Sequence, residues 1–122
     1  MAGIDVVISG IGQSAVGRKL AQSGLELTVD ASLEAIADAG LTVADIDGLS
    51  TFPGRRPDAI PFSPVGTMDL KDALGLKLDW FAGATEGSAQ IGAIINAYAA
   101  IKAGLVRHVL CFRTVKEGSG GA

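Results

Sequence analysis

The chain has 122 residues, of which 48% are hydrophobic and 19% charged, and its formal net charge is −3. This balance excludes a disordered chain and gives no reason to expect binding to nucleic acid or to anionic membranes. With a single cysteine, Cys111, neither an internal disulfide nor a cysteine-based metal site can form, so we expect no metal and a reducing, cytoplasmic location.

The first third of the chain predicts a strand followed by a helix. The run IDVVISGIG, residues 4–12, is rich in β-branched residues and ends in glycines, which is typical of a buried first strand. Residues 28–40 predict a helix, because their apolar residues share one face and Gly40 stands where helices commonly end. No signal peptide is visible before the first predicted strand.

The middle of the chain predicts short elements on both sides of a loop. Residues 42–45 resemble a single helical turn, and residues 46–52 predict a second strand. All four prolines fall within residues 53–64, which predicts a loop there. A short helix is expected over residues 66–75, and a strand over residues 76–81.

The last third predicts a long helix and a final strand. Residues 85–104 carry apolar side chains on more than one face, so we expect this helix to be enclosed on most sides; its apolar run is too short and too polar for a membrane span. Residues 106–115 predict a strand and residues 116–122 a flexible end. The alternation predicts an α/β layered fold with a mixed, mostly parallel sheet, and we expect residues 1–122 to be one incomplete domain.

Four isolated motifs have competing interpretations. Residues 10–15, GIGQSA, fit a dinucleotide fingerprint, but the helix that follows does not lead straight into a second strand, so a tight glycine turn is favoured. Cys111 shares a predicted strand face with Arg113, which favours a reactive thiolate only weakly over a buried structural cysteine. His108 is expected to be solvated or capping, and the arginine pair at residues 55–56 to be solvated rather than phosphate-binding.

The start of the long helix is the predicted site. Thr85 is a plausible N-cap, and the carboxylate of Glu86 is favoured there by the helix dipole, which is the structural interpretation. In the functional interpretation, the free N–H groups of the first turn hold a carbonyl, thioester or anion, and Glu86 is the candidate catalytic residue. The residues expected to contact the substrate are Gly83, Ala84, Thr85, Gly87 and Ser88.

Three stretches together resemble the N-terminal half of a thiolase-superfamily protein. VVISGIGQSAVGR is similar to the opening strand and loop of that family, and GSAQIGAIINAYAAIKAGLVRHVLCFR to its central helix and following strand. LELTVDASLEAIADAGLTVADIDGLSTF resembles its first helix and second strand, and the segment from Ala37 to Gly48 is the most specific part. The closest branch is the sterol-carrier-protein-X type, with its bacterial lipid-transfer proteins and acetyl-CoA acetyltransferase homologues.

The resemblance implies a five-layered αβαβα fold of two similar halves, usually dimeric, with the central helix buried between two sheets. It also implies an acyl-accepting cysteine at the start of that helix. The equivalent position falls within residues 84–87, where this sequence has no cysteine, and Cys111 lies too far along to replace it. Acyl transfer through a cysteine is therefore doubtful, whereas some relatives of this branch lack the cysteine and act as aldolases.

Two hypotheses of function follow from the resemblance. The first is an enzyme of lipid metabolism and steroid degradation that takes acyl-CoA or sterol-CoA thioesters without a further cofactor. A retro-aldol cleavage of β-hydroxyacyl-CoA is then the expected chemistry, beside a small OB-fold partner, with this chain inactive alone. The second is a non-catalytic acyl-CoA-binding or scaffolding subunit, completed by another chain. The assembly is expected to be a homodimer or a hetero-oligomer, and dinucleotide binding is a distant third.

Overall fold

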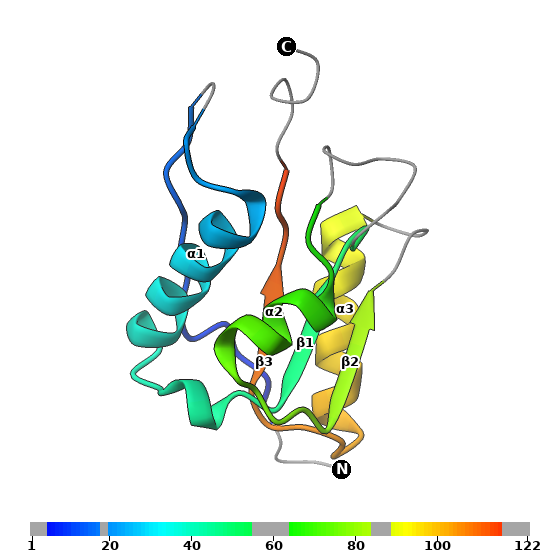
Figure 1. The fold of residues 1–122 in the computed structure, drawn as a ribbon. Helices are drawn as coiled ribbons and strands as arrows, with labels where there is room; N and C mark the ends of the chain where they lie inside the picture. Colours follow the sequence, from blue (N-terminus) through cyan, green and yellow to red (C-terminus); the bar gives the residue numbers. More distant parts are fainter. Residues whose placement is uncertain (1–4, 18–19, 55–63, 84–88, 116–122) are drawn as a thin grey trace.

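Three α-helices and three strands make up the described part of the protein (Figure 1). The computed structural model describes residues 5–17, 20–54, 64–83 and 89–115. In chain order the elements are helix α1 (Gly24–Asp38), the single 3-10 turn η1 (Val43–Asp45), strand β1 (Gly48–Thr51), helix α2 (Thr67–Leu74), strand β2 (Trp80–Gly83), helix α3 (Ala89–Lys102) and strand β3 (Val109–Phe112).

The three strands form one sheet in the order β2-β1-β3. Both pairings are parallel, and Gly48 at the start of β1 lies opposite Trp80 of β2 and Val109 of β3. Helix α3 packs on one face of the sheet, and α1 and α2 lie on the other (Figure 1). The predicted α/β class is confirmed, although the sheet is parallel throughout its described strands rather than mixed.

The two faces of the sheet are packed with different kinds of side chain. The apolar core lies between the sheet and helices α1 and α2, and its buried members are Ile36, Ile46, Leu49, Val65, Leu70, Leu76, Leu110 and Phe112. Toward α3 the buried residues are the alanines at positions 93, 97 and 100. Small side chains let α3 lie close to the sheet, where the Ser50 hydroxyl donates to the Ala93 carbonyl at 2.7 Å.

Helix α1 begins earlier than the sequence analysis predicts. The Ser23 Oγ accepts from the Glu26 amide at 3.1 Å, and the Glu26 carboxylate accepts from the Ser23 amide at 2.9 Å. This reciprocal capping box satisfies amides that would otherwise lack partners, so the helix starts at Gly24 and not at residue 28. The predicted glycine stops are confirmed, since Gly40 and Gly75 follow α1 and α2 with φ of 73° and 68°.

The predicted first strand is wrong. Residues 5–12 pair with no strand among the described residues, and Val7, Ile8 and Ile11 are 74–75% exposed. Gly10 and Gly12 lie so close to α1 that a Cβ at either would collide with its backbone. The glycines therefore serve close approach to a helix, which differs from both the tight turn and the dinucleotide fingerprint considered above.

Helix α3 is less enclosed than predicted. Ile91, Ile95 and Tyr98 are 49–64% exposed, so only its alanine side is covered within the described part of the chain. The helix is described from Ala89 on, and its predicted start at residue 85 lies outside the described residues. The strand predicted over residues 76–81 is instead Trp80–Gly83. Leu76 is 4% exposed because it enters the core directly after the left-handed Gly75. In the regions that the structure describes, no helix has the length and apolarity that a membrane crossing requires.

Candidate functional site

The carboxyl ends of the three parallel strands meet at one edge of the sheet. β1 ends at Thr51, β2 at Gly83 and β3 at Phe112, and α3 begins at Ala89 after the chain leaves β2. In open α/β sheets, ligands bind beyond the carboxyl ends of the strands. This edge is therefore the candidate functional site, and Gly83, one of the residues predicted to contact the substrate, ends β2 here.

A cavity of about 480 Å³ opens at this edge, between the ends of β1 and β2 and the start of α2. Its size falls within the usual range of small-molecule sites, roughly 300–1,000 Å³. The described residues that line it include Thr51, Gly54, Met68, Asp69, Phe81 and Gly83. Gly83, predicted to contact substrate, is thus at the cavity wall.

Packing does not explain the glycine at position 83. A Cβ added there would lie 3.6 Å from the Thr51 methyl carbon, which is an ordinary van der Waals distance. The absent side chain therefore leaves room at the cavity wall rather than avoiding a collision. This agrees with the predicted role of Gly83 in giving a ligand close access to the backbone, which stays a prediction.

Two polar side chains that line the cavity already have structural partners. Thr51 is 2% exposed, and its hydroxyl donates to the Phe112 carbonyl at 2.7 Å, which joins the ends of β1 and β3. The Asp69 carboxylate accepts from the Gly66 amide at 2.9 Å and caps the start of α2. Neither side chain is arranged as a base for a ligand in this cavity.

The first residue of α3 has a backbone conformation that is rare for a residue with a Cβ. Ala89 has φ of 56°, in the left-handed region. For L-residues this conformation costs roughly 1–2 kcal/mol, and such strain is concentrated at active sites and ligand clamps. Sequence reasoning missed Ala89, because alanine carries no signal of a left-handed conformation.

Most of the predicted site residues lie outside the described residues. These are Ala84, Thr85, Glu86, Gly87 and Ser88. The structure describes the residues on either side of them, with Gly83 ending β2 and Ala89 starting α3. The role of Glu86 and the substrate contacts of its neighbours remain predictions.

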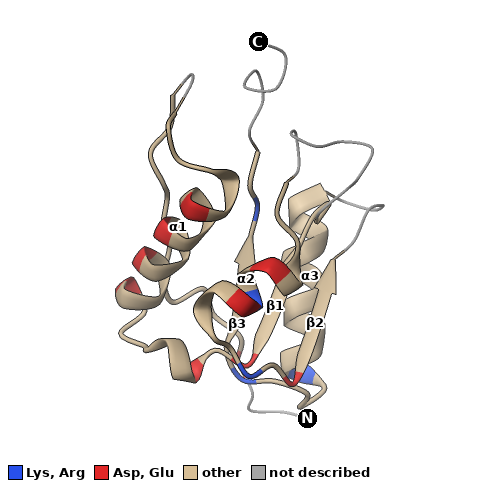
Figure 2. Cartoon of the chain, viewed as in Figure 1, with Lys and Arg blue, Asp and Glu red and all other residues tan. Residues whose placement is uncertain are grey.

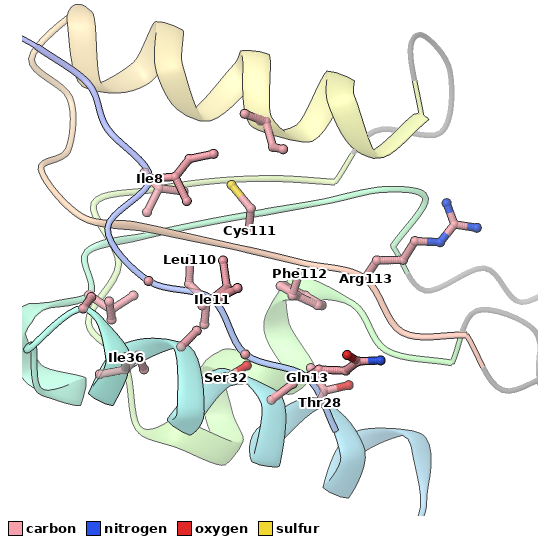
Figure 3. A pocket seen from close by; sticks show the side chains of 18 of the residues that line it. Ile8, Ile11, Gln13, Thr28, Ser32, Ile36, Leu110, Cys111, Phe112 and Arg113 are labelled. Atoms are coloured by element: carbon pink, nitrogen blue, oxygen red, sulfur yellow. The ribbon is translucent and has the colours of Figure 1, made fainter. Parts of the chain in front are cut away.

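A larger cavity, of about 970 Å³, lies at the free edge of β3 (Figure 3). It is lined by residues 6–17 and by parts of α1, α3 and β3. Figure 3 shows Cys111 pointing toward α3, whereas Leu110 and Phe112 point toward α1, as strand alternation requires. Most of the described residues that line this cavity are apolar or small.

Cys111 does not have the properties of a nucleophile. Burial raises the pKa of its thiol to about 11, whereas a reactive cysteine needs a lowered pKa. Its sulfur faces the Ala93 carbonyl of α3 at 4.0 Å. The Arg113 guanidinium lies over the Phe52 ring, 5.9 Å from its centroid. These observations favour the structural interpretation of the cysteine.

The opposite, amino-terminal edge of the sheet is held together by an aspartate. The Asp47 carboxylate accepts from the His108 amide at 2.8 Å and from the Arg107 amide at 3.0 Å, which fixes the start of β1 against the start of β3. Next to it, Gly48 is packed so that a Cβ would lie 3.0 Å from the Val109 side chain. His108 takes part through its backbone rather than as a capping side chain.

A second aspartate holds the short turn before β1. The Asp45 carboxylate accepts from the Thr42 amide at 2.8 Å. This bond, with a further one from the Thr42 hydroxyl, lowers the pKa of Asp45 below its ordinary value. Both aspartates of the DIDGL sequence are therefore accounted for by structure.

Acidic residues recur along α1 (Figure 2). They are Glu26, Asp30, Glu34 and Asp38, and two of them hold neighbouring segments. Asp38 accepts from the Ile11 amide at 2.9 Å, and Asp30 from the Gln22 side chain at 2.7 Å. Within the described ranges, no three His, Cys, Asp or Glu residues group as metal ligands would.

Known proteins are similar to this chain over nearly all of its length. A steroid side-chain-cleaving aldolase of Thermomonospora curvata is 32% identical over 116 residues, which are 93% of this chain and 27% of that protein. A 17-hydroxy-3-oxo-4-pregnene-20-carboxyl-CoA lyase of Mycobacterium tuberculosis is 30% identical over 124 residues, covering 95% of this chain and 28% of that protein. No model of a known protein family matches the sequence.

A solved structure named Ltp2-ChsH2(DUF35) aldolase is similar in fold as well as in sequence. Its TM-score is 0.79 and its sequence identity 32%, and the match covers 93% of this chain and 28% of that one. The chain therefore spans between a quarter and a third of the length of the proteins that it matches.

These relatives correct the identification made from the sequence. They are named as aldolases and a lyase, not as thiolases, acyltransferases, lipid-transfer proteins or sterol carriers, so the assignment to a thiolase of the sterol-carrier type is wrong. The fold also differs from the implied half of an αβαβα protein, since it has a three-stranded parallel sheet and a partly exposed α3. The segment from Ala37 to Gly48, which carried the resemblance most specifically, builds a helix end, a turn and a strand start. Such features define backbone geometry and not chemistry.

Proposed function

We propose that this chain forms part of a carbon–carbon lyase that cleaves β-hydroxyacyl-CoA thioesters by a retro-aldol reaction, with steroid side chains as the substrate class. The observation that carries the proposal is the similarity, at 30–32% identity over at least 93% of the chain, to proteins named for this chemistry. Because the chain spans 27–28% of their lengths, we propose the activity for a larger assembly and not for these 122 residues alone.

The reaction needs a base and a means of stabilising an enolate. The base removes the proton of the β-hydroxyl group, the carbon–carbon bond breaks, and its electron pair passes to the thioester as an enolate. The hydroxyl-bearing carbon becomes a ketone or aldehyde, and a proton returned to the α-carbon gives a shorter acyl-CoA. Since nothing is oxidised or reduced, the CoA thioester serves as substrate and we propose no further cofactor.

We propose that the start of α3 provides the site of this reaction. The amides of a helix N-terminus are suited to hold the thioester oxygen as it gains negative charge. Glu86 is proposed as the base, with Ala84, Thr85, Gly87 and Ser88 as substrate contacts. The position of Gly83 at a cavity of about 480 Å³ and the left-handed Ala89 on the other side support this location.

We further propose that the assembly includes a second protein and is cytoplasmic. The name of the solved relative joins two components, which favours a hetero-oligomer over a homodimer. A small OB-fold protein is the proposed partner, which would bring the acyl-CoA substrate to the site. Co-purification of the tagged chain with such a protein would test this part independently of activity.

A chimera tests the proposed activity. The matched 116 residues of the Thermomonospora curvata aldolase would be replaced by this chain, so that the rest of that protein, together with the proposed OB-fold partner, completes the assembly. With 17-hydroxy-3-oxo-4-pregnene-20-carboxyl-CoA as substrate, we expect release of a steroid ketone, measured by mass spectrometry. Glu86→Gln should lower the rate about 100-fold or more, as expected for loss of a general base. Glu34→Gln, an exposed change on α1, is the matched control and should leave the rate unchanged.

One observation favours the second hypothesis, a non-catalytic acyl-CoA-binding or scaffolding subunit. Thr51 and Asp69, which line the cavity with polar atoms, are both held in structural hydrogen bonds. The same chimera separates the two functions. A folded chimera that binds the substrate but releases no ketone would contradict the enzyme and favour the binding subunit.

A further inference from the structure

The free edge of β3 is a prominent unpaired feature of the described structure. One side of β3 pairs with β1, and no described strand pairs with its other side. Residues 6–17 run beside this side and are held to α1 through the bond from the Ile11 amide to Asp38, at 2.9 Å. Figure 3 shows this segment passing between α1 and α3, with the cavity of about 970 Å³ between it and the strand.

The walls of this cavity combine exposed apolar side chains with an unpaired strand edge. Val7, Ile8 and Ile11 are 74–75% exposed although all three are β-branched, and all three line the cavity. An open strand edge presents a row of N–H and C=O groups that readily pairs with another chain. A molecule that occupies this cavity must therefore supply apolar groups for its walls and backbone N–H and C=O groups for the edge of β3. A steroid or an acyl chain would fill the apolar space but would leave that row without partners.

The size of the cavity fits one strand. Neighbouring strands lie ~4.8 Å apart, layers pack ~10 Å apart and a strand rises ~3.3 Å per residue, so each residue of a sheet occupies roughly 160 Å³. The volume of about 970 Å³ thus corresponds to about six residues. This is the usual length of a strand in a globular protein.

The charges at the cavity restrict the kind of strand that fits. Arg107 and Arg113 line it at the two ends of β3, and no acidic residue is among the described residues that line it. A strand with alternating apolar residues and an acidic residue near its end would be complementary. The chain covers 27–28% of its curated relatives, so most of each relative lies outside the matched region and contains candidate segments.

We propose that this cavity is a docking slot for one β-strand. The strand comes from polypeptide outside these 122 residues, of the kind that forms the unmatched part of the relatives. It inserts between residues 6–12 and β3, pairs with the free edge of β3, and places alternate apolar side chains toward α1 and toward α3. The proposal concerns the free edge of the sheet and does not depend on the proposed lyase activity.

Peptide binding tests the slot directly. The probes are fluorescein-labelled 12-residue peptides that tile the unmatched part of the Thermomonospora curvata aldolase, and the readout is fluorescence anisotropy with the 122-residue chain. We expect one peptide, or a few that overlap, to bind and to slow hydrogen exchange at the Val109 and Cys111 amides, which face away from β1 in the parallel register of β1 and β3. If no peptide binds, or if exchange at β3 is unchanged, the proposal is overturned.

Two matched controls separate strand pairing from general hydrophobic adhesion. Ile8→Lys, inside the slot, should weaken binding about tenfold, because an isoleucine that the bound strand would cover is replaced by a charge. Ile91 is 64% exposed and does not line the cavity, so Ile91→Lys should leave the affinity for the peptide unchanged. A peptide methylated at alternate backbone nitrogens should not bind the unaltered chain, since it cannot pair with β3. Undiminished binding of the methylated peptide would contradict a strand slot. Displacement of the unmethylated peptide by a 3-oxo-4-pregnene steroid would contradict it as well.

Discussion

The two ends of the parallel sheet are held in different ways. At the amino-terminal edge, a carboxylate accepts hydrogen bonds from two backbone amides of the neighbouring strand, at 2.8 and 3.0 Å from Asp47. At the carboxyl-terminal edge, the connection is a neutral bond from Thr51, and beside it lie the glycines at positions 54 and 83 and the left-handed Ala89. Charge-assisted bonds are about twice as strong as neutral ones. The sheet is thus fixed most firmly at the edge away from the candidate site, and the edge with space and strain is the one proposed to bind substrate.

The largest effect is expected at Asp47. Asp47→Ala leaves the Arg107 and His108 amides without their acceptor, and should lower the free energy of unfolding by about 2 kcal/mol. Urea unfolding followed by circular dichroism would measure this change. Asp79→Ala, an exposed change at the same end of the sheet, is the control. An equal decrease in the free energy of unfolding for the two variants would show that the Asp47 carboxylate does not specifically stabilise this edge.

A smaller effect is expected at the other edge. Thr51→Val removes the hydroxyl that donates to Phe112 and should cost about 1 kcal/mol. The Phe112 carbonyl keeps a second donor, the Gln90 side chain at 3.3 Å, so the acceptor is not left unsatisfied. The same urea measurement applies. A loss larger than that of Asp47→Ala would reverse the proposed order of the two edges.

Strain at the start of α3 can be tested with a pair of glycine substitutions. Ala89→Gly removes the Cβ from a left-handed residue and should raise the free energy of unfolding by up to about 1 kcal/mol. Ala93→Gly, at a fully buried position in the same helix, should instead lower it by about 1 kcal/mol or more. If both substitutions destabilise equally, Ala89 carries no strain. Activity of the chimera with Ala89→Gly would then show whether the left-handed conformation matters for function.

Features that are set by local sequence patterns could be predicted from the sequence. The α/β class and the glycine helix ends follow from local patterns, which the local backbone obeys. The start of α1 at Gly24 was also readable, since Ser23 and Glu26 have the spacing of a capping box. By contrast, the left-handed Ala89 depends on its surroundings, and nothing in its identity indicates it.

Residues 5–12 show a different limit of sequence reasoning. β-branched residues predict an extended backbone but not a pairing partner, and here the described chain offers none. The apolar pattern of α3 likewise predicts that its sides are covered but not by which polypeptide. The resemblance based on residues 37–48 failed as an identification for a related reason. Its aspartates and glycines stabilise the turn and the strand ends at one edge of the sheet, and this structural role carries no information about the reaction.

The smallest effect concerns the pH dependence of the amino-terminal edge. The Thr42 amide and hydroxyl hold the pKa of Asp45 below its ordinary value of 3.8 in the folded chain. Asp45 therefore stabilises the fold at pH values above the ordinary pKa, and this contribution is lost as the pH falls through the lower, folded pKa. NMR titration of the Asp45 carboxyl carbon should give a midpoint below 3.8. Thr42→Ala should move that midpoint only part of the way back, because the backbone bond is the larger cause and remains. A midpoint at the ordinary value would mean that the Asp45 carboxylate does not hold the turn before β1. Among the described residues, Asp47 would then be the only carboxylate shown to hold this edge of the sheet through backbone amides.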